Sequence, residues 1–312
     1  MAPLDYRALA VLDAVASHGS FEKAALALGI SQSAVSQRIK ALEDAAGRLL
    51  IVRGQPAVPT GLGQRLVSHH RNVRLMEASL DIDLGNKTSM PEIALAVDSA
   101  SLATWFPLSL HPLLSPPRCQ LNIQQATREM ALHLVREGSV LGAIAADGAG
   151  SSSGSSAGSG SGSGSGEHAA NGPVVTPLGK MRYVCVATPV FAGHWFGDGF
   201  SVEAARLAPA VACDADMMGE FLREVLGLHG AYPRHTLPLS PASSECVHGS
   251  LSYGLMPLAQ VSKALADGRL VDLAPGRHVD VALSWHAWNL DTPFTRALSE
   301  QIIATGRRYL LT

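Results

Sequence analysis

The sequence predicts an all-α N-terminal domain, then one long helix, and then a two-lobed α/β domain. Three observations support this fold class. Apolar residues recur at helical spacing up to residue 84, strand-like and helix-like segments alternate from residue 92 onward, and a stretch of glycine and serine interrupts that alternation near residue 150. The chain has 312 residues, which is too many for one typical domain, so about two or three units are expected.

A helix-turn-helix pattern begins near residue 20. The first helix is predicted over residues 21–28, where Gly29 ends it in the left-handed conformation and Ser31 caps the helix that follows. The small residues Ala24 and Ala25 let the two helices cross closely. This small pair and the spacing of the turn distinguish the pattern from an ordinary helical hairpin, which is the alternative interpretation.

The second helix has one apolar side and one hydrogen-bonding side. Val35, Ile39 and Leu42 share the apolar side of the helical wheel. The side chains that we expect to contact DNA are Gln32, Ser33, Ser36, Gln37, Arg38 and Lys40. Glutamine can bind the edge of adenine, serine can bind phosphate oxygens, and the two basic residues add positive charge. Because this face is rich in glutamine and serine rather than glutamate, it favours a DNA-reading helix over a merely solvated one.

Two more segments complete a winged helix-turn-helix domain over residues 1–59. Residues 6–17 have apolar side chains at helical spacing and predict the third helix of a small core. Residues 49–52 and 57–58 predict a two-stranded wing, which brings Arg53 to the DNA backbone. Between Arg38 and Arg74 there are seven basic residues against two acidic ones, a local excess that suits DNA although the whole chain has a formal charge of -2.

A long helix is predicted from Thr60, which caps it, in a linker and hinge segment over residues 60–90. Its apolar stripe is close to a heptad seam and consists of Leu62, Leu66, Val73, Met76, Leu80 and Leu84. A single helix with such a stripe and no neighbour in sequence needs a partner chain, so the pattern predicts a homodimer. Adjacent residues on a helix point roughly 100° apart. We therefore expect His69 and His70 at the surface or in an interface rather than on a shared metal ion.

The two lobes are predicted over residues 91–312. Strand-like segments lie at residues 92–98, 121–126, 141–146, 182–187, 208–213 and 280–288. Helix-like segments lie at residues 101–114, 128–137, 217–226 and 295–310. The alternation predicts parallel strands, with a first lobe at about 91–178 and 275–312, a second at about 179–274, and a cleft between them. The glycine and serine insert at 148–166 has no apolar side chains and is expected to be a flexible coil.

Composition and motifs exclude several classes of protein. No apolar run resembles a signal peptide or a membrane span, so a soluble cytoplasmic protein is expected. The cysteines lie far apart and are interpreted as buried thiols; they are Cys119, Cys185, Cys213 and Cys246. Because no phosphate loop, nucleophile elbow, paired-histidine metal spacing or dinucleotide fingerprint occurs, we predict no catalysis, no metal and no cofactor. The alternatives from other classes are an enzyme with a DNA-binding appendage and a DNA-organising protein without a ligand.

With these elements in place, the chain resembles the LysR-type transcriptional regulators. The stretch SFEKAALALGISQSAVSQRIKALE at residues 20–43 is similar to the family's most specific motif, and PTGLGQRL at 59–66 matches its helix start. DSASLATWF at 98–106 and LSWHAWNLDT at 283–292 look like the ArgP/LysG branch. The resemblance implies a dimerisation helix and a two-lobed effector domain like a periplasmic binding protein. It also implies promoter DNA, RNA polymerase and a homotetramer as partners, and control of a basic amino acid exporter or related genes by lysine or arginine.

The resemblance places the effector site between the lobes. In the first lobe the family's positions match Asp98, Ser99 and Ser101 at one helix start, where backbone amides can hold a carboxylate, and Thr127 at the next. In the second lobe the matching loop is residues 214–218. A cationic amino acid needs carboxylates near its charges, and the acidic candidates are Asp98, Asp214, Asp216 and Glu245. For Asp214 and Asp216, capping of the next helix is the alternative role.

Two departures from the family pattern leave the effector open. Arg128, itself a candidate effector contact, stands where relatives that respond to basic amino acids tend to be acidic, so a non-basic effector is the alternative within this class of regulator. In residues 243–257 the chain is about one helical turn shorter, and Ser250 and Ser252 stand where glycine is usual. We therefore expect the second lobe to be distorted or to have a different cleft.

Overall fold

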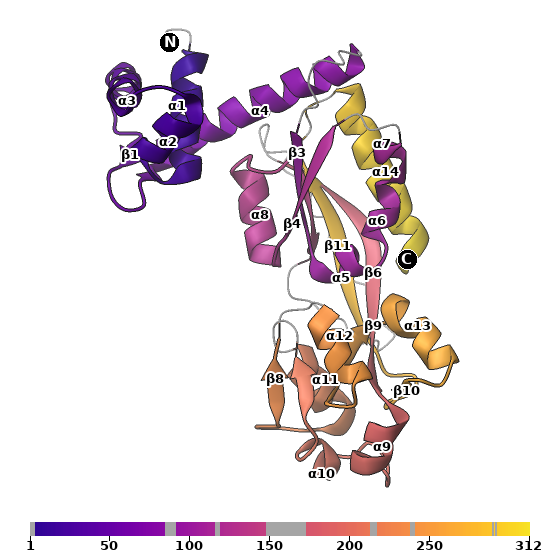
Figure 1. The fold of residues 1–312 in the computed structure, drawn as a ribbon. Helices are drawn as coiled ribbons and strands as arrows, with labels where there is room; N and C mark the ends of the chain where they lie inside the picture. The colour runs from indigo at the N-terminus through magenta and orange to yellow at the C-terminus, as the bar shows by residue number, and fades with distance from the viewer. Residues whose placement is uncertain are drawn as a thin grey trace, which may run out of the picture.

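The computed structural model describes residues 4–84, 92–115, 119–147, 173–212, 217–237, 241–288, 290 and 292–312. Figure 1 shows a small N-terminal helical domain at one end of the long helix α4, and an elongated α/β domain whose two lobes follow one another along two long strands. The predicted order of a helical domain, a long helix and a two-lobed α/β domain is confirmed.

Three short helices form the N-terminal domain, and each begins at a capping side chain. They are α1 (Tyr6–His18), α2 (Phe21–Leu28) and α3 (Gln32–Ala46). Asp5, Ser20 and Ser31 accept hydrogen bonds from backbone amides in the first turns of these helices. A glycine with a φ between 62° and 65° follows each helix, which confirms the predicted stop at Gly29.

One apolar core holds this domain together and includes the wing. Val35, Ile39 and Leu42 of α3 are buried in it, as the helical wheel predicts. The strands β1 (Ile51–Val52) and β2 (Val58–Pro59) pair in antiparallel fashion. The predicted two-stranded wing is therefore confirmed.

Helix α4 (Gly61–Asp83) begins after the Thr60 cap and has two environments along its length. Its first half packs into the N-terminal core, where Val67 is fully buried. In its second half Met76 and Leu80 are exposed. Part of the predicted apolar stripe is thus covered within the chain itself, and the rest remains exposed.

The expectation for the two adjacent histidines is wrong for His70, which is buried inside the chain. It is only 5% exposed, and its Nδ1 atom lies 3.2 Å from Oδ2 of Asp13 on α1. His69 instead contacts the start of α1, where its Nε2 atom lies 3.2 Å from the hydroxyl of Tyr6. The sequence around His70 does not indicate Asp13 as its partner, because 57 positions separate the two residues.

The first lobe is built on three parallel strands. β3 (Glu92–Val97) lies between β4 (Gln120–Gln125) and β5 (Gly142–Ala146) and pairs in parallel with both. Helix α8 (Arg128–Arg136) connects β4 to β5. These elements confirm the predicted strand-helix-strand pattern of this lobe.

The helix predicted over residues 101–114 is three short helices instead. They are α5 (Ser99–Ala103), α6 (Phe106–Ser109) and α7 (His111–Leu114). Pro107 and Pro112 stand in the first turns of α6 and α7. Proline lacks an amide hydrogen and disfavours a helical conformation at the preceding residue, so each proline ends one helix and begins the next.

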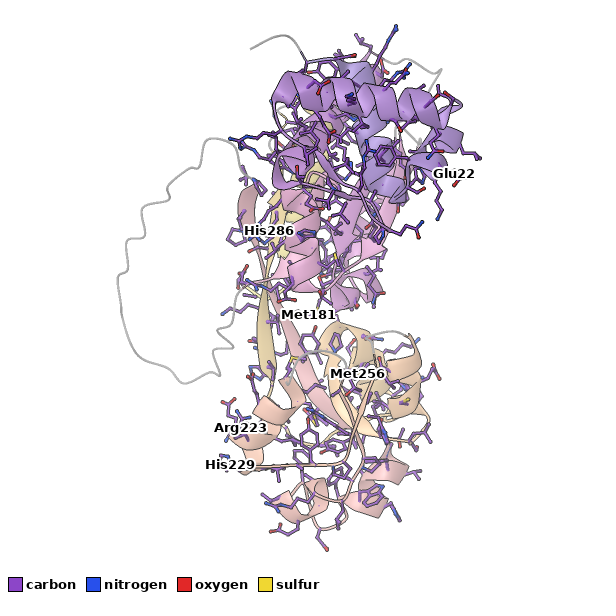
Figure 2. All side chains as sticks on the ribbon, turned by 90° about the vertical axis from the view of Figure 1, so that its left-hand side faces the viewer. Glu22, Met181, Arg223, His229, Met256 and His286 are labelled. Carbon is purple, nitrogen blue, oxygen red and sulfur yellow. The ribbon has the colours of Figure 1, made fainter. Side chains whose placement is uncertain are left out.

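Both lobes share one nine-stranded sheet with the order β4-β3-β5-β11-β6-β9-β7-β8, and β10 pairs with β6. The long strands β6 (Val174–Ala187) and β11 (Val279–Ala287) pair in antiparallel fashion and pass from one lobe to the other. Figure 2 shows Met181 of β6 where this strand passes from one lobe to the other. The chain therefore crosses between the lobes in strands, and β6 is much longer than the predicted segment at residues 182–187.

The second lobe contains the remaining short elements. Its strands are β7 (Ala210–Ala212), β8 (Arg234–Thr236), β9 (Tyr253–Pro257) and β10 (Val271–Asp272). Its helices are α9 (Pro189–Trp195), α10 (Val202–Ala205), α11 (Met217–Leu226), α12 (Pro241–His248) and α13 (Leu258–Ala266). The last helix, α14 (Pro293–Tyr309), returns to the first lobe and packs against α6.

The segment in which the sequence departs from the family pattern retains a helix and a buried strand, α12 and β9. Ser250, between them, has a φ of 60°, a left-handed conformation that glycine adopts more easily than serine. Its hydroxyl lies 2.6 Å from Oγ1 of Thr188. The position therefore does adopt a glycine-like backbone, and here a serine occupies it with a side-chain hydrogen bond.

None of the helices in the described residues combines the length and the apolar character that crossing a membrane requires. Cys119 and Cys185 are buried free thiols, and Cys246 is a partly buried one. Cys213 and the insert at residues 148–166 lie outside the described residues. Within the described part of the chain, no cluster of three or more histidine, cysteine or acidic side chains is placed to hold a metal ion.

Candidate DNA-binding surface and effector site

The outer face of α3 carries the side chains that we expect to contact DNA. Burial of the opposite face of α3 in the N-terminal core fixes how the helix is rotated. The exposed candidates are Gln32, Ser33, Gln37, Arg38 and Lys40, and Ser36 is half-buried. The hydroxyl oxygen of Ser33 lies 2.9 Å from that of the cap residue Ser31, so it is held at the helix start. One rigid helix therefore presents a continuous hydrogen-bonding surface.

Arg53 extends this candidate surface into the wing. Its guanidinium carbon lies over the ring of Phe21, 5.6 Å from the ring centroid, and this cation–π contact ties the wing to α2. Arg71, by contrast, belongs to the basic segment in sequence but not to this surface. Its guanidinium bonds to Asp13, and only 22% of its side chain is exposed. The basic surface therefore contains fewer side chains than the seven basic residues between Arg38 and Arg74.

A second candidate site lies at the carboxyl ends of the three parallel strands of the first lobe. These ends are adjacent because Val97 of β3 pairs with Gln125 of β4 and with Ile144 of β5. Asp98 follows β3 directly, and Thr127 caps the helix that follows β4. In open α/β sheets, ligands bind just outside the carboxyl ends of the strands. The fold therefore brings two candidate effector residues to the edge where a ligand is expected.

Asp98 has one carboxylate oxygen that is used by the protein and one that is not. Its Oδ1 atom accepts a hydrogen bond of 2.9 Å from the amide of Ser101 and so caps α5. Its Oδ2 atom is buried and has no hydrogen-bond partner among the described residues. Burial raises the pKa of the Asp98 carboxyl above its ordinary value, and hydrogen bonds from Ser101 and the backbone offset only part of this shift. A cationic group beside Oδ2 would compensate the cost of this buried charge.

The neighbouring candidates differ in accessibility. Ser99 is half-buried in the first turn of α5. Ser101 is fully buried, and its hydroxyl accepts a hydrogen bond of 3.2 Å from the indole of Trp105. Thr127 is exposed, and its hydroxyl accepts a hydrogen bond of 3.4 Å from the amide of Met130 at the start of α8. Ser101 therefore supports the site from inside the lobe, whereas Thr127 stands at its surface.

Arg128 places a positive charge at the same edge of the sheet. Its Nε donates a hydrogen bond of 2.9 Å to the carbonyl of Ala146 at the end of β5, and its Nη1 lies 3.8 Å from Oε1 of Glu129. On β11, His286 has a lowered pKa, mainly because it is buried; the charge of Asp147 opposes this shift, and the charges of Arg128 and Arg136 add to it in smaller part. Figure 2 shows His286 in the first lobe. The edge therefore combines a buried carboxylate with a guanidinium.

In the second lobe, Glu245 is exposed on α12. Figure 1 shows α12 at the end of the second lobe that is nearer to the first lobe. Asp214 and Asp216 lie outside the described residues, just before α11. The structure thus brings Asp98, Thr127 and Arg128 to one edge of the first lobe and places Glu245 on the other lobe.

One contact that the sequence did not indicate joins α4 to the first lobe. Nη1 of Arg71 donates a hydrogen bond of 2.6 Å to the hydroxyl of Ser139, and the hydroxyl of Ser68 donates to the carbonyl of Glu137. The available signal was the interruption of the apolar stripe by polar residues at 68–72. This polar interruption shows that the apolar stripe is not continuous, but it does not identify Glu137 or Ser139 as the partners.

Comparison with known proteins places these features in a family context. A family model described as "Bacterial regulatory helix-turn-helix protein, lysR family" matches residues 6–64. Over nearly the whole chain, the sequence is 37% identical to the HTH-type transcriptional regulator ArgP of Aeromonas salmonicida, with 99% of each chain covered. It is 38% identical to ArgP of Pseudomonas aeruginosa strain UCBPP-PA14, with 96% of this chain and 95% of the relative covered.

Solved structures agree with this likeness. ArgP from Mycobacterium tuberculosis matches with a TM-score of 0.81 and 30% identity, and the match covers 99% of both chains. Full-length LysG from Corynebacterium glutamicum with bound effector Arg matches with a TM-score of 0.73 and 27% identity, over 99% of this chain and 100% of that one. The similarity therefore includes the N-terminal domain, the long helix and both lobes.

Proposed function

Because this chain belongs to the LysR family of bacterial helix-turn-helix transcriptional regulators, we propose that it binds promoter DNA through α3 and the wing under the control of a small effector. Its relatives at more than 30% identity span almost its entire length and are named as transcriptional regulators. The function class is therefore a DNA-binding regulator. The contact residues and the effector are our assignments.

The DNA contacts that we assign lie on the recognition helix and the wing; they are Gln32, Ser33, Ser36, Gln37, Arg38, Lys40 and Arg53. Exposure of the polar side chains on one rotationally fixed helix supports this assignment. The glutamines have the geometry to bind base edges in the major groove, and the basic residues suit the phosphate backbone. In a dimer, two such helices would enter successive major grooves of an imperfect palindrome.

The effector that we assign is a basic amino acid, arginine or lysine. The observation that carries this assignment is the buried Oδ2 atom of Asp98, which has no hydrogen-bond partner in the described part of the chain. An ammonium or guanidinium beside that oxygen would form a charge-assisted hydrogen bond. At the same edge, Arg128 and the first amides of α8 suit the ligand's carboxylate. Ser99, Ser101 and Thr127 line or support this site. LysG of Corynebacterium glutamicum, whose bound effector is arginine, supports the same ligand class.

A second positive charge on the ligand needs a second carboxylate. We assign this role to the acids of the second lobe, Asp214, Asp216 and Glu245, the last of which is exposed on α12. A non-basic amino acid is the alternative effector, because Arg128 puts a positive charge at the site. Such a ligand would use Asp98 for its ammonium and would not need the acids of the second lobe.

The remaining parts of the proposal follow from the family. The exposed stripe of α4, which includes Met76 and Leu80, would form a homodimer with a second copy of the chain, and pairs of dimers would form a tetramer. The tetramer would contact RNA polymerase and control an amino acid exporter or related genes. A regulator that binds chromosomal DNA acts in the cytoplasm, and we place this protein there. We assign it no catalytic activity and no cofactor.

Calorimetry of the full chain against the twenty amino acids tests the effector assignment. Arginine or lysine is expected to bind, and neutral or acidic amino acids are expected to bind at least tenfold more weakly. Preferential binding of a non-basic amino acid would support the alternative effector. No heat and no thermal shift with any amino acid would leave a DNA-organising protein as the better description, and turnover of a bound amino acid would indicate an enzyme.

A further inference from the structure

Helix α8 connects the candidate effector site with the contact between the first lobe and α4. Its first residues, capped by Thr127, lie at the edge of the sheet that carries Asp98. Its nine residues span roughly 13 Å at the rise of an α-helix. The turn that ends it, at residues 137–139, lies against α4. A displacement at one end of a rigid helix therefore reaches the other end.

The turn at residues 137–139 is closely fitted to α4. Ser68 donates a hydrogen bond to the carbonyl of Glu137, and Arg71 donates one to the hydroxyl of Ser139. Gly138 has a φ of 67°, and a Cβ atom placed on it would lie 3.2 Å from the Cα atom and the carbonyl oxygen of Ser68. Any larger residue would be strained in this conformation and would push the turn away from α4.

Arg71 also binds the DNA-binding domain. Its Nε donates a hydrogen bond of 2.8 Å to Oδ1 of Asp13, and its Nη2 donates one of 2.9 Å to the hydroxyl of Ser17, both on α1. His70 contacts the other carboxylate oxygen of Asp13 at 3.2 Å. Burial alone would raise the pKa of Asp13, but the bonds from His70 and Arg71 lower it below its ordinary value. One guanidinium therefore bonds both to the first lobe and to the helix that supports the DNA-reading helices.

We propose that α8 couples the effector site to the DNA-binding domain through a junction of Asp13, Arg71, Gly138 and Ser139. An effector at the amino end of α8 favours one position of this helix and therefore one arrangement of the junction, which fixes the position of the first lobe against α4 and α1. The coupling is reciprocal, so DNA binding changes the amino end of α8 in turn. The inference rests on the proposed function, because it assumes that an effector binds beside Asp98.

The first test measures coupling in the full chain. The affinity for a duplex that the protein selects from a random pool is measured by fluorescence anisotropy, with and without L-arginine or L-lysine. In the unaltered protein the amino acid is expected to change this affinity at least about fivefold. In the double variant Gly138→Ala with Ser139→Ala the change is expected to fall below twofold, although calorimetry still detects the amino acid.

A matched control separates coupling from general damage to the first lobe. Ser299→Ala removes a hydrogen bond of 3.1 Å from the indole of Trp285 in the same lobe, away from α8. This variant is expected to keep the full effect of the amino acid on DNA affinity. Equal coupling in the junction variant and in the unaltered protein would overturn the inference, and so would equal loss of coupling in the junction variant and in Ser299→Ala.

A second readout does not depend on the effector. Amide hydrogen exchange is measured over residues 127–131 with and without the selected duplex. The duplex is expected to change exchange there in the unaltered protein but not in the double variant. If neither arginine nor lysine binds while this exchange difference is present, the effector assignment fails and the coupling stands. If the duplex leaves exchange at residues 127–131 unchanged in the unaltered protein, the coupling through α8 is wrong.

Discussion

Asp98 accepts a hydrogen bond of 2.9 Å from the amide of Ser101 through Oδ1, while its Oδ2 atom is buried without a partner among the described residues. Capping of α5 therefore uses only one of the two oxygen atoms of the Asp98 carboxylate. A buried, half-satisfied acid costs free energy in the unliganded protein, and a cationic ligand removes that cost. The effector assignment rests on this relationship.

Asp98→Asn is expected to preserve or raise the thermal stability of the unliganded protein, since the amide oxygen can still cap α5 and no charge is buried. The same variant is expected to weaken arginine binding at least tenfold, because it removes the only negative charge of the residue. Thermal melts and calorimetry measure the two effects separately. Asp198→Asn, at an exposed aspartate of the second lobe, is the matched control and should change neither.

The raised pKa of Asp98 predicts how arginine binding depends on pH. A cation favours the ionised carboxyl, so binding releases a proton when the pH lies below the raised pKa of the unliganded protein. Affinity should therefore increase as the pH rises from about 3.8 through that pKa and then become constant. Over the same window, this group makes the unliganded protein less stable as the pH rises. Calorimetric titrations in two buffers of different ionisation enthalpy detect the proton, and Asp98→Asn should release none.

Gln32→Ala combined with Ser36→Ala is expected to abolish preference for the selected duplex and leave the folded state intact, because neither side chain belongs to the core. Lys40→Ala is the contrasting variant. It should weaken binding to all duplexes similarly and lower the salt dependence by about one counterion. Anisotropy titrations at several salt concentrations measure both. Unchanged sequence preference in the double variant would remove α3 as the reading helix.

The pair of Asp280 and Arg182 joins β11 to β6 with two hydrogen bonds of 2.8 Å. The bonds from Arg182 lower the pKa of Asp280, so the pair stabilises the fold above about pH 3.8 and its contribution is lost as the pH falls through the lowered pKa. Asp280→Asn should destabilise the protein by ~1 kcal/mol near neutral pH and by less near about pH 3. Urea unfolding measures the difference. Asp267→Asn, in the exposed pair with Arg269, should have no measurable effect at either pH.

Two substitutions at Ser250 separate backbone strain from the side-chain hydrogen bond to Thr188. Ser250→Ala loses the bond and keeps a left-handed non-glycine residue, whereas Ser250→Gly loses the bond and relieves the strain. The glycine variant is therefore expected to be more stable than the alanine variant by ~1 kcal/mol. Equal stability of the two variants in urea unfolding would show that the backbone at this position is not strained.

Local patterns were sufficient to predict the N-terminal domain. Gly29 and Ser31 act within three or four residues of their own positions, so their roles as a helix stop and a helix cap can be inferred from neighbours in sequence. Periodicity likewise located the strands of the first lobe. Periodicity does not show the division of residues 101–114 into short helices, because the apolar spacing continues through Pro107 and Pro112.

The contacts that the sequence could not predict join residues that are far apart in the chain. Arg71 and Ser139 are 68 positions apart, and no pattern near either one indicates the other. His70 was expected at the surface or in an interface for the same reason, since its partner Asp13 lies on α1. At the effector site, the sequence predicts Asp98 as a candidate. That its buried Oδ2 atom has no hydrogen-bond partner among the described residues is visible only in the three-dimensional structure.

A single titration determines whether a basic amino acid at Asp98 controls DNA binding. The affinity for the selected duplex is measured with and without saturating L-arginine, and then with L-lysine, in the unaltered protein and in Asp98→Asn. In the unaltered protein, one of the two amino acids is expected to change the affinity at least about fivefold, and in Asp98→Asn neither is expected to change it. The same change in both proteins, or no change in the unaltered protein, would contradict control of DNA binding by a basic amino acid at Asp98.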